Sequence, residues 1–135
     1  MSAIRDLTQL LKSMSPILQD GLFVFCTFPE SSYGDHARLE PVVAAVEAEG
    51  LTLVIPQSKA NRFDIAYDGV YKMISLEVHS SLDAVGLTAA FSTKLSEHGI
   101  SANVIAGYYH DHIFVQAPKA ELAMKVLGEL GDENS

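Results

Sequence analysis

Three residues, Ser80, Asp83 and Gly86, have the side chains and the spacing to bind a small anion at the start of a helix. The first turn of a helix exposes unpaired N–H groups and a positive dipole end, which together favour a carboxylate. Gly86 lacks a Cβ atom that would hold a ligand away from the main chain. Asp83, or carbonyl groups of a facing strand, could accept hydrogen bonds from an ammonium group. This chemistry suits an amino acid.

The whole candidate binding site lies between that helix start and a strand, at an expected interface with another structural unit. The residues expected to line it are Ser80, Ser81, Leu82, Asp83, Val85, Gly86, Leu87, Asn103, Ile105 and Ala106. The alternative interpretation is structural, because serine and aspartate at a helix start are expected for capping alone.

A second kind of chemistry is suggested by His110 and His112. Residues two apart on a strand point to one face, so these imidazoles, with Asp111 nearby, could form a metal or acid–base site. Catalytic zinc usually needs three protein ligands, and the other histidines show no recognised ligand spacing. Signatures of phosphate loops, serine nucleophile elbows and Cys–His pairs are also missing from the sequence. We therefore interpret this segment as a solvated hairpin, and we predict no catalytic residue, metal or cofactor.

The second half of the chain has the elements needed to position the first site. Apolar and polar residues alternate from Ile74 onward, which predicts a half-buried strand. Ser80 with Asp83 fits a capping box, so a helix is expected to begin there. Residues at intervals of three and four define the buried face of this helix, which ends at Gly99: Ala84, Leu87, Phe91 and Leu95.

Two further strands and a helix complete this half. Runs prone to β-structure at 100–105 and 113–115 flank a polar turn at 108–111, which predicts a hairpin. Leucines and valines at helical spacing predict a final helix at 119–130. Only five polar residues follow, so the closing strand of a βαββαβ unit is missing. We expect that strand to come from the first half of the chain or from another subunit.

The first half is less regular. We expect an amphipathic helix at 3–14, a buried strand at 22–26, and a loop at 30–35. The alanines of 42–48 are compatible with a helix, but the β-branched valines and a strand-like run at 51–55 favour a β-hairpin. A short helix at 57–64 and a turn at 67–69 would follow. A hairpin followed by a helix thus occurs in both halves, which is consistent with a diverged duplication.

Composition restricts the partners. The chain has 135 residues, 48% of them hydrophobic, and a formal charge of −8 with only nine lysines and arginines. Nucleic-acid binding depends on clustered basic residues, so nucleic acid is not an expected partner. The uncharged stretch at 21–29 is too short to span a membrane, and the N-terminus lacks signal-peptide features, so we expect a cytoplasmic protein and no membrane partner. The single cysteine, Cys26, lies in an apolar run and is interpreted as a core residue.

The residues around the first site carry a family resemblance. Leu82 to Leu87, followed by Phe91, Leu95 and residues 99–104, resembles the ACT domain, in which a glycine opens the first helix and a Gly-Ile pair leads into the second strand. Many ACT domains have proline just before that glycine, whereas this chain has Val85, which is similar to the aspartate-kinase variety.

The whole chain resembles small bacterial proteins built from two ACT-like units, in which stretches similar to 49–54 and 109–113 recur. Those proteins are similar in turn to the ACT units of aspartate kinases and of cytosolic arginine sensors. The resemblance implies an α+β, ferredoxin-like fold with two βαββαβ units, whose antiparallel sheets have helices on one face. The expected domains are 1–70 and 71–135, the second completed by a strand from the N-terminal half.

The resemblance also implies a function: a regulatory protein without catalytic activity that binds a small molecule, in our interpretation an amino acid. An open sheet edge favours subunit pairing, so we expect a homodimer. Two alternatives remain, a protein–protein interaction or dimerisation module that binds no ligand, and a metal-dependent enzyme using His110 and His112.

Overall fold

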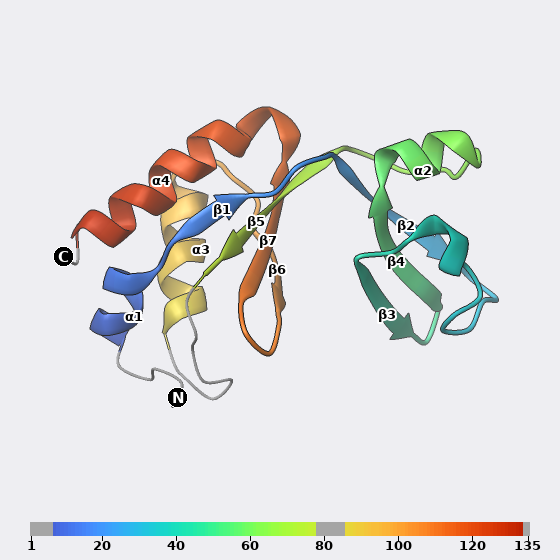
Figure 1. Cartoon of the computed structure of the whole chain (residues 1–135), viewed down its shortest axis with the longest axis horizontal. Helices are drawn as coiled ribbons and strands as arrows, with labels where there is room; N and C mark the ends of the chain where they lie inside the picture. Colours follow the sequence, from blue (N-terminus) through green and yellow to red (C-terminus); the bar gives the residue numbers. More distant parts are fainter. Residues whose placement is uncertain (1–6, 78–85, 134–135) are drawn as a thin grey trace. The chain divides into compact units, whose positions relative to one another are not determined.

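The computed structural model describes residues 7–77 and 86–133, which belong to two compact units (Figure 1). Unit 1 consists of Met1–Asp20 and Lys72–Ser135, and unit 2 consists of Gly21–Tyr71. The chain therefore begins in unit 1, forms unit 2, and then returns to unit 1. The domains expected from the sequence, 1–70 and 71–135, assign the first residues differently, and that division stays a prediction.

The sheet of unit 1 is antiparallel with helices on one face, as the sequence predicted. Its strands follow the order β1 (Pro16–Leu18), β5 (Tyr71–Leu76), β7 (Asp111–Gln116) and β6 (Asn103–Ala106). The helix α3 (Leu87–Glu97) connects β5 to β6, and α4 (Ala120–Glu133) follows β7 after a short 3-10 turn, η2 (Ala117–Lys119). β1 comes from the first half of the chain and pairs with β5, where Ile17 lies opposite Ser75. It thus gives unit 1 a fourth strand.

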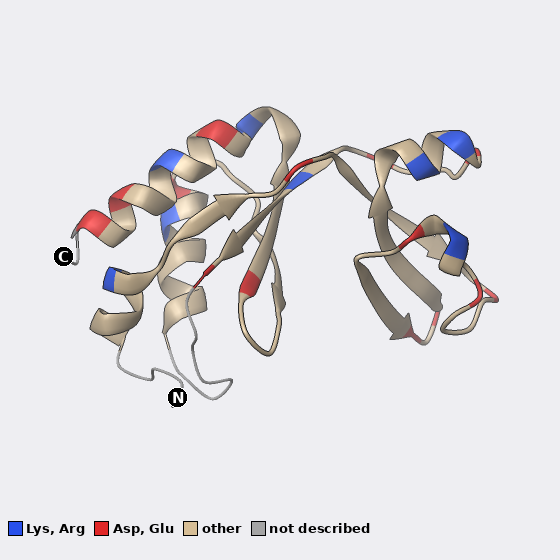
Figure 2. Cartoon of the chain, viewed as in Figure 1, with Lys and Arg blue, Asp and Glu red and all other residues tan. Residues whose placement is uncertain are grey.

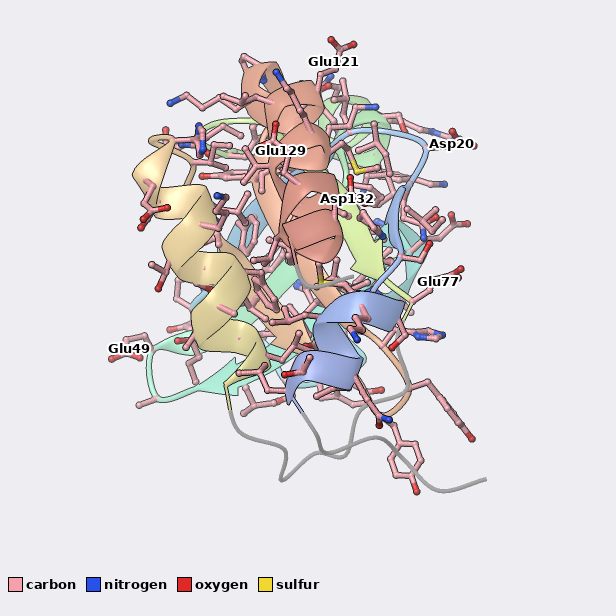
Figure 3. The ribbon with its side chains drawn as sticks, turned by 90° about the vertical axis from the view of Figure 1, so that its left-hand side faces the viewer. Asp20, Glu49, Glu77, Glu121, Glu129 and Asp132 are labelled. Carbon is pink, nitrogen blue, oxygen red and sulfur yellow. The ribbon has the colours of Figure 1, made fainter. Side chains whose placement is uncertain are left out.

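The core of unit 1 lies between this sheet and its helices. Leu87, Phe91 and Leu95 lie on one face of α3 because they are four residues apart, and all three are buried. They form one apolar cluster with residues of α4, of the sheet and of α1 (Leu7–Ser13). The outer face of α4 exposes the acidic residues Glu121, Glu129 and Asp132 together with Lys125 (Figure 3).

Unit 2 has a smaller sheet. Its strands follow the order β3 (Val43–Glu47), β4 (Gly50–Pro56) and β2 (Phe23–Phe28), and β2 pairs with the start of β5 only where Phe23 lies opposite Tyr71. A short helix, α2 (Gln57–Arg62), follows β4, and a 3-10 turn, η1 (Ala37–Leu39), precedes β3. The predicted hairpin and short helix are confirmed.

Cys26 belongs to the core of unit 2. It is 4% exposed and lies in a cluster with Leu39, Leu53, Ile55 and other apolar residues. Burial raises the pKa of the thiol, so Cys26 remains protonated at neutral pH and is a poor nucleophile. The core interpretation of this residue is confirmed.

The start of α3 differs from the prediction. Gly86 precedes the helix with a φ of +103°, a left-handed conformation that a continuous right-handed helix from Asp83 could not contain. The predicted capping box of Ser80 and Asp83 is therefore not the cap of α3. The segment 78–85, like residues 3–6 of the predicted first helix, lies outside the described residues.

Two features of the whole chain bear on its partners. None of the helices in the described part of the chain is long and apolar enough to cross a membrane. Lysines and arginines are interspersed with acidic residues in both units (Figure 2). This distribution gives no support to a nucleic-acid surface, which would need clustered basic residues.

Candidate functional site

The first turn of α3 is the described part of the predicted anion site. Gly86 is the N-cap residue and offers no side-chain hydrogen bond to the helix, while its carbonyl oxygen accepts the N–H of Ala90 at 2.9 Å. The next residues along the surface, Thr88 and Ala89, are exposed. Because the N–H groups of a first helical turn have no partner within the helix, they can bind an anion there.

The space beside Gly86 is filled by the protein itself. A Cβ atom at this position would lie 3.0 Å from Cδ2 of Leu7 and 3.5 Å from its Cδ1, so α1 packs against the glycine. On that side, Gly86 permits the tight turn before α3 and allows α1 to pack closely against it. Leu87, also expected at the site, is 4% exposed and points into the core.

The strand side of the predicted site is β6, an edge strand of unit 1. Among the described strands, β6 pairs only with β7, with Asn103 opposite Phe114, Ile105 opposite His112 and Ala106 opposite Asp111. The amide Nδ2 of Asn103 donates to the carbonyl oxygen of Phe114 at 3.1 Å, so this side chain helps to hold the hairpin together.

The remaining residues of the predicted site lie outside the described residues: Ser80, Ser81, Leu82, Asp83 and Val85. Their position against β6 stays a prediction. The described part contains the helix start and the edge strand between which the pocket was predicted.

A polar chain in unit 1 that the sequence did not reveal involves His112. Its Nδ1 lies 2.7 Å from the Oγ of Ser75, and Nε2 of Gln19 donates to the same Oγ at 3.1 Å. An amide nitrogen can only donate, so the serine hydroxyl is free to donate to Nδ1, which places the imidazole proton on Nε2. His112 is 37 positions from Ser75 in the sequence, and Gln19 is 56 positions from Ser75, so no local pattern connects the three residues.

Burial shifts the pKa of both titratable residues of β7, His112 and Asp111. It lowers the pKa of His112, His110 lowers it further, and Asp111 acts in the opposite direction. Burial also raises the pKa of Asp111, although His112 opposes that effect. The neutral form of His112 is therefore favoured, and it suits the hydrogen-bond chain to Ser75.

The geometry does not favour the metal or catalytic alternative. β7 begins at Asp111, and His110 belongs to the preceding turn, as the predicted turn at 108–111 has it, so the two imidazoles do not share the strand face that the metal alternative requires. Nδ1 of His112 is already hydrogen-bonded, and Ser75 is only 3% exposed, too buried to act as a nucleophile. Within residues 7–77 and 86–133, no group of three histidine, cysteine or acidic side chains could hold a metal ion.

Comparison with known proteins decides the family. Models of the ACT domain match residues 2–72 and 69–129, which together span nearly the whole chain. The chain belongs to the ACT-domain family. It contains two ACT domains in tandem, and such domains are typically regulatory ligand-binding modules.

Solved structures of other proteins are similar to this chain over most of its length. A Vibrio cholerae protein of unknown function, described as a possible transport protein, is 54% identical, with a TM-score of 0.85, over 93% of this chain and 95% of the other. The ligand-free regulatory subunit of aspartate kinase from Thermus thermophilus is 9% identical, with a TM-score of 0.60, over 88% and 99%.

Aspartokinase III of Escherichia coli, in complex with aspartate and ADP, is 11% identical, with a TM-score of 0.62, over 90% of this chain and 33% of the other. At these identities, the two kinase structures show that the ACT fold is shared. No curated protein sequence matches the chain significantly.

Proposed function

We propose that this tandem ACT protein is a regulatory protein that binds an amino acid and has no catalytic activity of its own. The observation that carries the proposal is the ACT match over both halves, because ACT domains are typically regulatory ligand-binding modules. The shared fold with a regulatory subunit of aspartate kinase supports it. A cytoplasmic location, inferred from the sequence, fits a sensor of free metabolites.

The proposed site lies in unit 1, between the first turn of α3 and β6. The ligand carboxylate would bind N–H groups near Thr88 and Ala89, because Leu7 occupies the side of Gly86. Its ammonium group would be held by Asp83 or by carbonyl groups of β6, as the sequence suggested.

We also propose that the protein is a homodimer. β3 lies at one end of the strand order of unit 2 and β6 at one end of that of unit 1, and no described strand pairs with the outer edge of either. β3 is unusually apolar for an edge strand, since Val46 is 77% exposed and neighbouring Val42 is 46% exposed. Proteins usually cover such an edge, and pairing with a second subunit is a common way to do so. The same observation would also fit a dimerisation module that binds no ligand.

The direct test is a thermal-shift screen of the standard amino acids. A ligand at about 100 times its dissociation constant adds about 2.7 kcal/mol to the free energy of unfolding, so at least one amino acid should raise the thermal midpoint clearly. A dimerisation module without a ligand would show no such shift with any of them, and that result would contradict the proposal.

A matched pair of variants locates the site. In Thr88→Glu, a carboxylate in the first turn should stabilise the free protein by about 0.3–1 kcal/mol and repel the ligand carboxylate, so the affinity should fall at least tenfold. Thr93→Glu makes the same change at an exposed position farther along α3, where the dipole effect has faded. It should bind like the wild type. Equal binding by both variants would show that the pocket lies elsewhere.

A further inference from the structure

In unit 2, the outer edge of β2 is open, and a groove runs along it. β2 pairs with β4 over its whole length on one side, but on the other side it pairs with β5 only where Phe23 lies opposite Tyr71. Beyond that pair, no described strand pairs with this edge. We propose that it binds an extended, positively charged segment of a target protein, which adds a strand to the sheet. This inference does not depend on the amino-acid site proposed in unit 1.

Comparison with unit 1 shows which strand the edge lacks. The strands β5, β7 and β6 follow one another across the sheet of unit 1, as β2, β4 and β3 do in unit 2. In unit 1, the outer edge of β5 is closed by β1, which pairs with Ile74–Leu76. The corresponding chain of unit 2, residues 63–70 between α2 and β5, contains no strand (Figure 1). The sheet of unit 2 therefore has an open position beside β2.

The main-chain groups of Thr27 point into this open position. The N–H of Gln57 donates to the carbonyl oxygen of Leu22 at 2.9 Å, so the main chain of Leu22 is directed toward the β4 side. Because this direction alternates along an antiparallel strand, the odd-numbered residues of β2 face the opposite edge. The pairing of Phe23 with Tyr71 at that edge agrees with this pattern. The N–H and C=O of Thr27, which is exposed, are thus available to another strand.

The groove along this edge is wide enough for a peptide segment. It has a volume of about 630 Å³ and is lined by residues 25–28 of β2 and by residues 64–68. The second wall is attached to α2. The N–H of Ile65 donates to a carbonyl group of that helix at 2.8 Å, and the hydroxyl of Tyr67 donates to Oδ1 of Asn61 at 2.8 Å. These contacts hold residues 64–68 on the helix, so the segment does not itself close the edge of β2.

The charges of the groove define the partner. Its described lining includes two exposed carboxylates, Asp64 and Asp68, and no lysine or arginine. The whole chain also has a formal charge of −8. In strand addition, main-chain hydrogen bonds supply affinity and side chains supply specificity. A segment with lysine or arginine side chains would therefore be attracted to this edge, whereas an acidic segment would be repelled.

A model peptide tests the proposal on the full-length protein. The probe is a short peptide of alternating lysine and valine, acetylated and amidated at its ends, which is titrated into ¹⁵N-labelled protein and followed by NMR. We expect saturable shifts at the amides of Thr27 and of residues 64–68. The Thr27 amide should exchange rapidly with solvent in the free protein. It should exchange at least about tenfold more slowly in the complex, where it donates to the peptide.

Modified peptides separate main-chain pairing from charge. Alternate N–H groups of an added strand face β2. Of two peptides, one N-methylated at the valines and the other at the lysines, one should therefore lose binding and the other should retain it. A peptide with glutamate in place of lysine should bind at least about tenfold more weakly, because it is repelled by the acidic groove.

Substitutions of Thr27 test the contact from the side of the protein. Thr27→Pro removes the outward N–H group but no hydrogen bond to β4, and proline is tolerated at the edge of a sheet. This variant should fold and fail to bind the lysine peptide. Thr27→Val is the matched control, because it keeps the N–H group and should bind like the wild type.

A second pair of variants tests the charges without changing the strand. Asp64→Asn combined with Asp68→Asn should weaken binding of the lysine peptide about fivefold. Asparagine is suited to the φ of +53° at Asp64, so the wall of the groove should be preserved. Glu49→Gln combined with Glu129→Gln removes the same charge from exposed positions outside the groove and should leave binding unchanged.

Four results would overturn the proposal. The first is the absence of saturable shifts at Thr27 with the lysine peptide. The second is a Thr27 amide that is already protected from exchange in the free protein, because the edge would then be occupied by this chain or by a second copy of it. The third is unchanged binding by both N-methylated peptides, and the fourth is equal binding by the aspartate double variant and its control.

Discussion

His112 couples the stability of unit 1 to pH. Burial and the neighbouring His110 lower its pKa, so the unfolded chain takes up a proton near about pH 6.5, before the folded protein does. The stabilisation is therefore fully present above that pH and is lost as the pH falls below it. Protonation would also prevent Nδ1 from accepting the hydrogen bond of Ser75.

Urea denaturation at a series of pH values measures this effect. Between about pH 7 and about pH 5, the free energy of unfolding of the wild type should decrease more steeply than that of His112→Gln, which has no titrating ring. Parallel curves for the two proteins would show that His112 does not control this range.

Gly86 is predicted to be sensitive to substitution for two separate reasons. Its φ of +103° is a left-handed conformation that costs an L-residue about 1–2 kcal/mol. An added Cβ atom would also press against Leu7 at 3.0 Å. Gly34 has a similar φ of +97° but no atom within 4 Å of the same position, so it isolates the first cost.

Denaturation of three single variants and one double variant separates the two costs. Gly86→Ala should destabilise the protein more than Gly34→Ala, and Leu7→Ala should be less damaging in the Gly86→Ala background than in the wild type. If the free energy of unfolding decreases equally in the two glycine variants, the close contact with Leu7 does not destabilise Gly86→Ala.

At the scale of elements, α1 and β1 are required to complete unit 1. Leu10 and Leu11 of α1 are buried in the same cluster as Phe91 of α3 and Leu127 of α4, and β1 pairs with β5. A fragment of residues 72–135 would lose these contacts and expose an unpaired strand edge. We therefore expect it to be largely unfolded by itself and to fold when a peptide of residues 1–20 is added.

Circular dichroism of the fragment, with and without the peptide, tests this expectation. Cooperative thermal unfolding of the fragment alone, with the midpoint of the intact protein, would contradict the assignment of the first 20 residues to unit 1. A peptide with Leu10→Asp and Leu11→Asp is the matched control, because it should not restore folding.

The elements that the sequence predicted well are those whose formation depends on residues close together in the chain. Spacing of four between Phe91 and Leu95 defines a helical face, and the valine-rich 42–48 next to 51–55 forms a hairpin. β1 was missed because three residues are too few to show alternation, and pairing with β5 makes them a strand. The helix start predicted from the capping pattern at Ser80 was too early, because Gly86 has a left-handed conformation directly before α3.

The candidate site was predictable only in part, for the same reason. The glycine before the helix and the edge strand β6 could be located from local sequence, but the contact of Leu7 with Gly86 joins residues far apart in the chain. The hydrogen-bond chain through Gln19, Ser75 and His112 is also long-range.

At the scale of the whole molecule, two ACT domains share one chain whose N-terminal segment belongs to the unit formed by its C-terminal half. A small protein of this kind can act on a separate target only if a signal reaches it, and a bound metabolite is the signal that its family membership suggests. The proposed function therefore depends on ligand binding more than on any single polar cluster.

Isothermal titration of the wild-type protein with the amino acid selected by the thermal-shift screen, repeated with Thr88→Glu and Thr93→Glu, tests this account most directly. We predict saturable binding by the wild type and by Thr93→Glu, and an affinity at least tenfold lower for Thr88→Glu. If no standard amino acid gives a saturable heat with the wild-type protein, the central claim is contradicted.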